Sequence, residues 1–172
     1  MPTRQLTVHT DGACHGNPGP GGYAAWWTWG NQRWEVLGGE LDTTNNRMEL
    51  GAVLAALRAI EQAQQQGFMN DIGSILIRSD SQYVIKGTTE WLAGWKRKGW
   101  RGSDKKPIKN QDLWVALDSA LNGFSKPWSM EWVRGHNGDF HNEHADALAQ
   151  EAVKQLKASK DRSLHYKRRV AQ

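Results

Sequence analysis

The sequence has very little cysteine and no long apolar run. Its 172 residues include one cysteine, Cys14, so an internal disulfide is impossible and nothing indicates an oxidising compartment. No apolar stretch approaches the ~18–20 residues of a membrane span, and the first residues lack the apolar core of a signal peptide. We therefore expect a soluble, cytoplasmic protein. The length fits one domain with one core, and the sequence contains no internal repeat.

A large net charge is also missing, but the value of +4 hides a segregation of charge along the chain. Residues 91–110 hold seven lysines and arginines against one acid, and residues 154–172 do the same. The remaining residues hold 8 basic and 16 acidic side chains. A polyanion that touched both basic segments would have to be tolerated by the acidic body. This suggests that bound metal neutralises some of the acids.

One of these acids, Asp11, stands where a predicted strand enters a glycine-rich turn. Residues 5–10 alternate with the period of two that is typical of a strand, and residues 12–22 form the turn. An acid at the end of a central strand is poorly solvated and needs a compensating cation. Taken alone, Asp11 is better explained as an aspartate that caps a turn.

Two further acids, Glu49 and Asp80, also have simple local explanations. Residues 23–29 and 34–39 predict two more strands, and residues 42–49 supply caps for a helix that ends near Gln66. Glu49 would then lie in the first turn, where an acid complements the helix dipole. The apolar run 74–79 predicts a strand that is buried on both faces and ends at Asp80. Asp80 or Ser81 could cap the helix that follows.

The second half of the chain adds three helices, one strand and a basic end. Helices are predicted at 88–98 and 111–121, a strand at 128–133, and a helix from Glu143 to about Lys157 with Asp146 in its first turn. Residues 159–172 are polar and basic with little apolar periodicity, which predicts a mobile tail after a domain of residues 1–158. Together the elements predict an α/β fold, a five-stranded mixed sheet with helices on its faces.

Tryptophans at positions 91, 95 and 100 interleave with the cations Lys96, Arg97 and Lys98. Flat aromatic surfaces beside cations suit a nucleic-acid backbone and its sugars. The alternative is a solvated helix end whose tryptophans pack inward.

Four carboxylates can converge on one rim of the predicted sheet. Asp11 and Asp80 leave strand ends, Glu49 and Asp146 open helices, and ligands of open α/β sheets collect outside the strand ends. Converging acids repel one another unless divalent cations lie between them, and Mg²⁺ fits such a site. Two ions about 4 Å apart can activate water and stabilise the leaving oxygen in phosphodiester cleavage.

Histidines in the loop before the last predicted helix raise the alternative of a zinc site. His136, His141 and His144 lie close together in the sequence. Neither a cysteine nor the tight histidine spacing of zinc ligand sets accompanies them.

Five motifs together resemble the bacterial type 1 ribonuclease H family, over about Thr7 to Ala152 and in the correct order. Single motifs of this kind are weak, but five in sequence that contain the four acids are highly specific. They are Thr10-Asp-Gly-Ala-Cys-His-Gly-Asn-Pro-Gly-Pro-Gly-Gly-Tyr23, Thr43-Thr-Asn-Asn-Arg-Met-Glu-Leu50, Ser79-Asp-Ser-Gln-Tyr-Val84, Asp104-Lys-Lys-Pro-Ile-Lys-Asn110 with Asp112-Leu-Trp114, and Trp132-Val-Arg-Gly-His136 with Asn142-Glu-His-Ala-Asp146.

The resemblance implies a ribonuclease H-like fold with strand order 3-2-1-4-5 and hydrolysis of the RNA strand of an RNA/DNA hybrid, leaving 5′-phosphate and 3′-hydroxyl ends. It implies two Mg²⁺ ions, with Mn²⁺ as a substitute. Asp11 would bridge the ions, Glu49 and Asp80 would complete one side and Asp146 the other. His136 would assist proton transfer or product release, a task that suits a group whose charge changes near neutral pH.

The resemblance also implies which residues bind the hybrid. Some would touch the minor groove, where 2′-hydroxyls distinguish RNA from DNA, and Asn17 and Thr44 would grip a phosphate of the DNA strand. Residues 91–109 match a basic protrusion, here named the handle. The full predicted set is Cys14, Asn17, Thr44, Asn45, Asn46, Gln82, Trp91, Lys96, Arg97, Lys98 and Asn142. A monomer is expected, with a single-strand DNA-binding protein as a possible partner.

The chain departs from the family pattern in places. Asp42 stands where relatives often carry a basic residue, and the loop 64–73 is longer than usual. Two other functions compete with the prediction. Integrases and junction resolvases share the sheet and the acids, but they lack the combination of Asn17, Asn45, Gln82 and the handle. A catalytically dead hybrid-binding module would require the loss of an acid, and all four are present.

Overall fold

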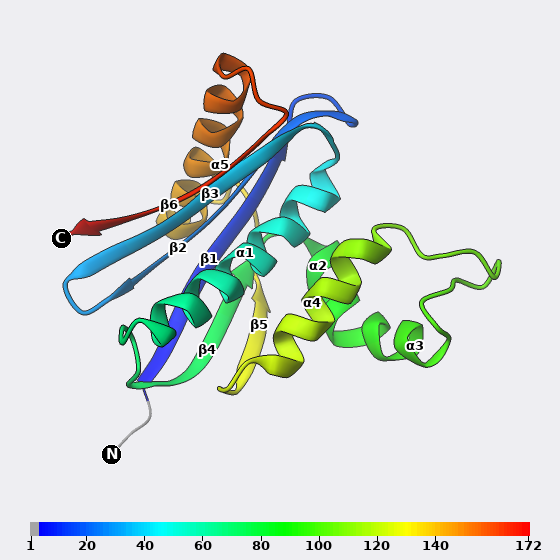
Figure 1. Cartoon of the computed structure of the whole chain (residues 1–172), viewed down its shortest axis with the longest axis horizontal. Helices are drawn as coiled ribbons and strands as arrows, with labels where there is room; N and C mark the ends of the chain where they lie inside the picture. The colour runs from blue at the N-terminus through cyan, green and yellow to red at the C-terminus, as the bar shows by residue number, and fades with distance from the viewer. Residues whose placement is uncertain (1–3) are drawn as a thin grey trace.

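The computed structural model describes residues 4–172, and a single twisted sheet organises them (Figure 1). The strands are β1 (Arg4–Cys14), β2 (Gly19–Trp29), β3 (Gln32–Thr43), β4 (Ile72–Ser79), β5 (Trp128–Trp132) and β6 (Ser163–Ala171). Their order across the sheet is β5-β4-β1-β2-β3-β6. The pairs β1–β4 and β4–β5 are parallel, and the other three pairs are antiparallel. The predicted order of the first five strands is therefore confirmed.

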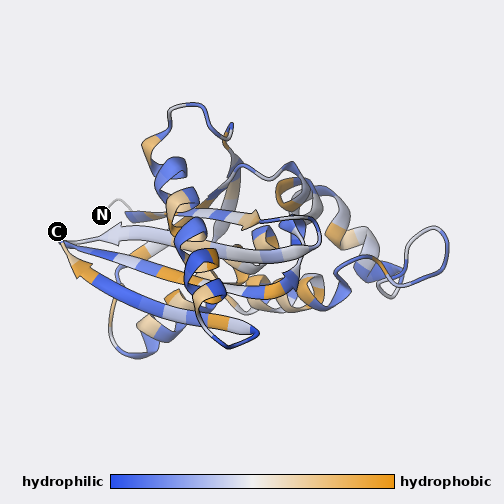
Figure 2. Ribbon diagram, turned by 90° about the horizontal axis from the view of Figure 1, so that it is seen from above, coloured by the Kyte–Doolittle hydropathy of each residue, from blue (hydrophilic) through white to orange (hydrophobic). Residues whose placement is uncertain are grey.

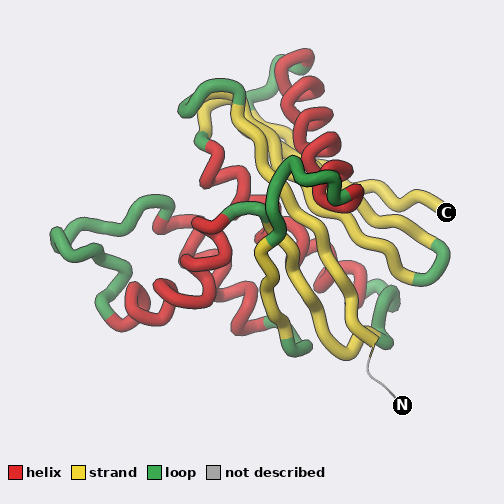
Figure 3. Tube along the Cα trace, turned by 180° about the vertical axis from the view of Figure 1, so that it is seen from behind, coloured by secondary structure: helices red, strands yellow, loops and turns green. Residues whose placement is uncertain are grey.

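Helices cover both faces of the sheet, as predicted. They are α1 (Asn45–Gln65), α2 (Gln82–Lys86), the π-helical segment η1 (Gly87–Trp91), α3 (Leu92–Arg97), α4 (Gln111–Gly123) and α5 (Phe140–Ala158). Helix α1 packs on β1 and β2 and against α4, whereas α5 crosses the opposite face over β1, β2 and β3. Figure 3 shows α5 alone on that face. None of the helices in residues 4–172 is both long and apolar enough to cross a membrane.

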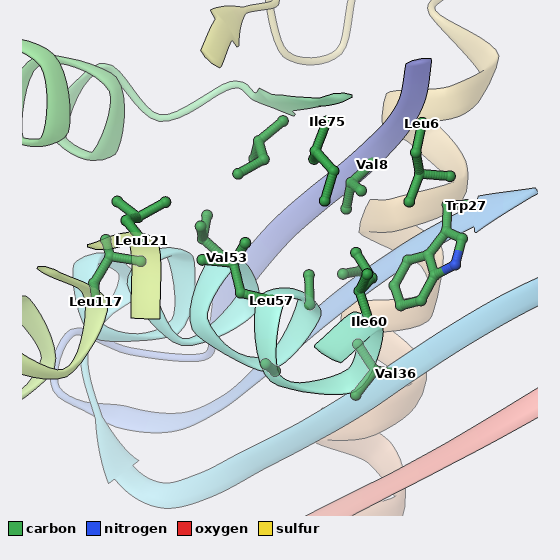
Figure 4. Close-up of a cluster of buried hydrophobic side chains, with 14 of the residues drawn as sticks. Leu6, Val8, Trp27, Val36, Val53, Leu57, Ile60, Ile75, Leu117 and Leu121 are labelled. Carbon is green, nitrogen blue, oxygen red and sulfur yellow. The ribbon is translucent and has the colours of Figure 1, made fainter. Parts of the chain in front are cut away.

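The larger core lies between the sheet and α1. Alternate residues of β1, among them Leu6 and Val8, point toward Val53, Leu57 and Ile60 on the inner face of the helix (Figure 4). A second, smaller core lies under α5, which uses mainly alanines and therefore approaches the strands closely. Because successive strand residues face opposite sides of a sheet, Thr7, His9 and Asp11 of β1 face α5.

The end of the chain corrects the prediction of a mobile tail and of a sheet with only five strands. Residues 163–171 form β6, which pairs with β3 along its length, from Glu40 opposite Ser163 to Gln32 opposite Ala171. Figure 2 shows β6 as a mainly hydrophilic strand with hydrophobic residues only near its ends. Because β6 contains few apolar residues, apolar periodicity in the sequence does not predict this strand.

A buried acid on the neighbouring strand, Glu35, pairs with a residue of β6. Glu35 on β3 has a side chain that is 1% exposed, and it accepts hydrogen bonds from Arg168 of β6 and from His144 of α5. Burial raises the pKa of Glu35, but these hydrogen bonds and the nearby guanidinium groups outweigh it and leave the pKa below its usual value. A buried carboxylate needs such partners, and the last strand supplies one.

Candidate active site

Asp11 lies near the end of β1, where its side chain is almost fully buried. The N–H of Gly12 donates a hydrogen bond of 2.9 Å to its Oδ1 atom. Gly12 itself touches the first turns of α1, because a Cβ atom added there would lie 2.6 Å from the backbone nitrogen of Glu49. The glycine therefore permits the close approach that brings the Asp11 strand against the helix that carries Glu49.

Glu49 lies one turn further into its helix than the sequence predicted. Thr44 is the N-cap residue of α1, and its Oγ1 atom accepts a hydrogen bond from the N–H of Arg47. The helix begins at Asn45, so its first turn holds no acid and Glu49 falls in the second turn. The carboxylate is 3% exposed, and among residues 4–172 its Oε2 atom has no hydrogen-bond partner. The helix-dipole explanation of Glu49 is therefore wrong.

Asp80 follows the end of β4 and does not cap a helix. Ser81 is the N-cap residue of α2, and its Oγ atom accepts a hydrogen bond of 3.1 Å from the N–H of Val84. The chain approaches Asp80 closely on its other side, since a Cβ atom at Gly135 would lie 2.7 Å from its Oδ2 atom. This leaves the half-buried carboxylate of Asp80 beside those of Asp11 and Glu49.

The fourth acid, Asp146, comes from the opposite face on α5. This helix begins at Phe140 and is capped by Asp139, whose Oδ1 atom accepts hydrogen bonds from the N–H groups of His141 and Asn142. The predicted start at Glu143 was thus three residues late, and Asp146 lies in the second turn. Asp146 and His136 line an open cleft of about 240 Å³ together with Asp11, Gly12, Asn45, Glu49, Asp80 and Ser81.

Three of the carboxylates crowd together tightly. One oxygen from each of Asp11, Glu49 and Asp80 lies within 4.8 Å of the other two. Burial raises the pKa of Asp11 to about 8, and the charge of Asp80 adds to this effect. Burial and the neighbouring Asp11 raise the pKa of Glu49 well above its usual value. Among the described residues no lysine or arginine forms an ion pair with these acids, and an all-oxygen site in which Oε2 of Glu49 lacks a partner fits a hard divalent ion.

His136 lies at the rim of the cleft, apart from the other two histidines of its segment. Its side chain is exposed, and its backbone adopts a left-handed conformation with φ of 54°. His141 stacks on His9, with ring centroids 4.5 Å apart, and also on Trp26. His144 also meets Trp26, edge-on with ring centroids 4.8 Å apart, and its Nε2 atom lies 3.0 Å from Glu35. His141 and His144 thus share an aromatic cluster, whereas His136 lies at the cleft.

The predicted hybrid-binding residues fall into groups around the cleft. Asn45 lines it, and its N–H donates a hydrogen bond of 3.0 Å to Oδ1 of Asn17 in the glycine-rich turn. Cys14 lies beside this turn, with its Sγ atom 3.5 Å from the carbonyl oxygen of Gly19. Asn46 and Gln82 are exposed at the starts of α1 and α2. Thr44 caps α1, whereas Asn142 is buried inside the first turn of α5.

The handle departs from the body beyond α2 and consists of α3 and a loop (Figure 1). Trp91 is 39% exposed and meets Tyr83 and Trp95 at angles near 60°. The predicted alternative, inward packing, holds in part, because Trp95 and Trp100 pack against the larger core. Lys96 forms an ion pair of 3.1 Å with Asp118, and Arg97 and Lys98 are exposed.

Sequence reasoning did not single out Arg47, although it ties the site to the helix beyond the handle. Its guanidinium donates two hydrogen bonds, of 2.9 and 2.8 Å, to the carboxylate of Asp112 in the first turn of α4. Arg47 lies two residues before Glu49, so this bidentate pair fixes α4 beside the first turns of α1. Arg47 and Asp112 both lie within the motifs quoted above, and those motifs were the signal that could have identified the pair.

Comparison with known proteins shows that the sequence is similar to those of one enzyme family. A model of the RNase H family matches residues 3–154. The ribonuclease H of Bordetella bronchiseptica is 51% identical over 150 residues, which cover 87% of this chain and 90% of that protein. The ribonuclease HI of Caulobacter vibrioides is 48% identical over 153 residues, covering 89% and 95%.

Solved structures show the same fold. LC9-RNase H1, a type 1 RNase H with the type 2 active-site motif, superposes with a TM-score of 0.73 at 33% identity, covering 90% of this chain and 74% of that chain. LC11-RNase H1, solved in complex with an RNA/DNA hybrid, superposes with a TM-score of 0.64 at 22% identity, covering 88% and 99%.

Proposed function

The chain belongs to the ribonuclease H family and is an endoribonuclease that acts on RNA/DNA hybrids, and we propose that it cuts the RNA strand at the cleft formed by Asp11, Glu49, Asp80 and Asp146. The observation that supports this assignment most directly is the crowding of buried carboxylates. Three of them have oxygens within 4.8 Å of one another, and Oε2 of Glu49 finds no hydrogen-bond partner within the described residues. Such a set can carry its full negative charge only when cations lie beside it.

We infer that two Mg²⁺ ions are the cations, with Mn²⁺ able to replace them. Carboxylate oxygens are the ligands that Mg²⁺ prefers, and it keeps water and substrate phosphate oxygens as its other ligands. When bound, the ions activate the attacking water and stabilise the leaving oxygen. Asp11 is central among the acids, because Asp80, Glu49 and Asp146 all act on its carboxylate, and it would therefore be a ligand of both ions.

The remaining residues of the cleft orient the substrate and handle protons. His136 is exposed at the rim and free to meet the scissile phosphate, so we assign it proton transfer or product release. Asn17 and Asn45 are joined by a hydrogen bond beside the acids, in a position to read the minor groove. Asn46, Gln82 and Cys14 extend this edge, and Thr44 borders the expected phosphate site. The burial of Asn142 makes it a residue that supports the cleft from within α5.

We assign the handle to backbone binding and not to chemistry. Trp91 offers an exposed aromatic surface, and Arg97 and Lys98 are exposed cations beside it. Lys96 is a weaker candidate because Asp118 already pairs with it. Contacts of this kind hold a sugar-phosphate backbone without reading its sequence.

The proposal is tested by incubating the purified protein and Mg²⁺ with a labelled RNA/DNA hybrid and with matched RNA and DNA duplexes. We expect cleavage of the RNA strand of the hybrid alone, with 5′-phosphate and 3′-hydroxyl ends. The Asp11→Asn protein should be inactive, and Glu61→Gln, which removes an exposed acid of the same helix as Glu49, should be active. Cleavage of duplex DNA, or an active Asp11→Asn protein, would contradict the assignment.

We further propose that the enzyme acts as a monomer, because one chain supplies all four acids of the cleft. Light scattering of the protein with and without hybrid should give the mass of one chain. A single-strand DNA-binding protein stays a predicted partner. Its binding can be measured by co-sedimentation.

A further inference from the structure

One stripe of side chains on α5 starts at the cleft and leads away from it. Asp146 is followed on the same face of the helix by Gln150, Lys154 and Lys157, at spacings of four, four and three residues. At 1.5 Å per residue, the distance from Asp146 to Lys157 along the helix is about 17 Å. Both lysines are exposed.

The stripe contacts the glycine-rich turn through His15. The Nδ1 atom of His15 lies 2.8 Å from Nζ of Lys157, and its Nε2 atom lies 2.8 Å from Oε1 of Gln150. A lysine ammonium can only donate, so Nδ1 accepts and Nε2 carries the proton that is donated to Gln150. His15 is two residues from Asn17, which bonds to Asn45 at the cleft. The stripe and the predicted hybrid-binding turn therefore form one surface.

Two more cations continue this surface where α5 joins β6. Lys160 and Arg162 are exposed, and the carbonyl oxygen of Arg162 accepts a hydrogen bond of 3.0 Å from the N–H of Leu41, which holds this link beside β3. Residues 154–162 contain four cations and one acid, Asp161. Within residues 4–172, none of the four cations forms an ion pair. We name the surface of Gln150, Lys154, Lys157, Lys160 and Arg162 the α5 track.

We propose that the α5 track binds the sugar-phosphate backbone of the hybrid segment that extends beyond the cleft. The inference rests on the proposed function, since it takes the hybrid to lie in the cleft. The roughly 17 Å along α5 from Asp146 in the cleft to Lys157 in the track corresponds to about five base pairs at roughly 3.4 Å each. Lysines on flexible stems suit backbone phosphates, because they act as point charges that need no fixed geometry. In Figure 1 the α5–β6 link lies beside the turn between β1 and β2, away from the handle.

The α5 track gives the enzyme a second basic surface that binds the substrate, in addition to the handle. The handle, which contains α3, lies beyond α2, whereas the α5 track approaches the glycine-rich turn from the other face of the sheet. The four cations of residues 154–162, which the cleft and the handle leave unexplained, thereby receive a partner. Asp42 lies near the segment that joins α5 to β6. Its exposed carboxylate repels phosphate and weakens binding of the backbone at this end of the track.

The test compares Lys154→Gln/Lys157→Gln with the matched double variant Lys126→Gln/Lys167→Gln. The matched variant removes the same charge, from the loop before β5 and from the α1 side of β6. With a hybrid of roughly 20 base pairs, the track variant should raise KM about three- to tenfold and leave kcat unchanged. Loss of two phosphate contacts should lower the log–log salt slope of binding by about 1.4 to 1.8. The matched variant should change neither quantity.

A short hybrid separates backbone contact from disturbance of the turn. A hybrid of about six base pairs that is cut at its centre extends about 10 Å to either side of the cleft, short of the roughly 12 Å along α5 from Asp146 to Lys154. With this hybrid the track variant should have the KM of the unaltered enzyme. An equal rise of KM with both hybrids, or no change with either, would overturn the proposal. Both outcomes leave the proposed function standing if the unaltered enzyme cleaves the hybrid. Failure of that cleavage would refute the function itself.

Discussion

Replacing Asp11 by asparagine should abolish cleavage and also make the metal-free protein more stable. The substitution keeps the shape of the side chain and an oxygen that can accept the hydrogen bond from the Gly12 N–H. It removes one of three carboxylates whose oxygens lie within 4.8 Å of one another. Binding of the hybrid should remain intact or become tighter, because repulsion between the acids and phosphate falls.

The size of the stabilisation follows from Coulomb's law. Two unit charges 4.8 Å apart repel by about 3.5 kcal/mol at an effective dielectric constant of 20. Without metal, protons on Asp11 and Glu49 relieve part of this repulsion near neutral pH. We therefore expect the free energy of unfolding to rise by about 1 to 3 kcal/mol in the Asp11→Asn protein. For a chain of this size, that corresponds to an increase in Tm of roughly 3 to 10 °C.

The stabilisation should grow with pH. The pKa of Asp11 is raised from 3.8 to about 8 in the folded protein, so between these values the folded state holds a proton that the unfolded state has lost. The stability contributed by this group is complete below pH 4 and is lost as pH rises through 8. The asparagine variant lacks this group, so the gap in Tm between the two proteins should widen from pH 4 to pH 8.

Thermal unfolding in a chelator, followed by circular dichroism at several pH values, measures this gap. Glu61→Gln serves as the control, because it removes an exposed acid from the same helix as Glu49 and should leave Tm within about 1 °C. Mg²⁺ should stabilise the unaltered protein more than the variant, since ligand binding to the folded state adds stability. A Tm that is unchanged or lower in Asp11→Asn would refute the reasoning.

Three further outcomes follow from the same geometry. His136→Ala should slow turnover without abolishing it, because water can replace a proton shuttle but not a metal ligand, and single-turnover rates as low as those of Asp11→Asn would require an essential role for His136. Ca²⁺ should bind but fail to support turnover, since its larger and looser coordination shell misplaces water and phosphate; equal rates in Ca²⁺ and Mg²⁺ would argue against the assigned ions. Replacing Lys96, Arg97 and Lys98 by alanine should raise KM several-fold and reduce the salt slope of binding without changing kcat, with the smallest share from Lys96 because Asp118 holds it. An unchanged KM and salt slope would identify these three residues as a solvated helix end.

Local sequence patterns determined much of this protein. The apolar run 74–79 placed Asp80 at the end of β4, and the structure confirms this. The alternation in residues 5–10 identified β1, but the strand continues through Asp11 to Cys14 and β2 already starts at Gly19, so the predicted turn of residues 12–22 is reduced to residues 15–18. Apolar residues recur every two positions in a half-buried strand and every three to four positions in a helix. A short stretch of sequence therefore predicts the type of each element. The roles of the four acids, in contrast, were predicted from five motifs considered together. Each acid alone could also be explained as a turn or helix cap, or as a charge that complements a helix dipole.

Only the tertiary structure decided the rest. Strand β6 pairs with β3 along nine residues, and its Arg168 reaches the buried Glu35, a contact between residues 133 positions apart that no local pattern encodes. The same holds for Glu49, whose burial and unpartnered Oε2 atom depend on how closely β1 can approach α1 at Gly12. The contacts of His15 with α5 join segments that lie 135 and 142 residues apart. Burial and charge pairing arise between distant segments, so they become defined only when the chain has folded.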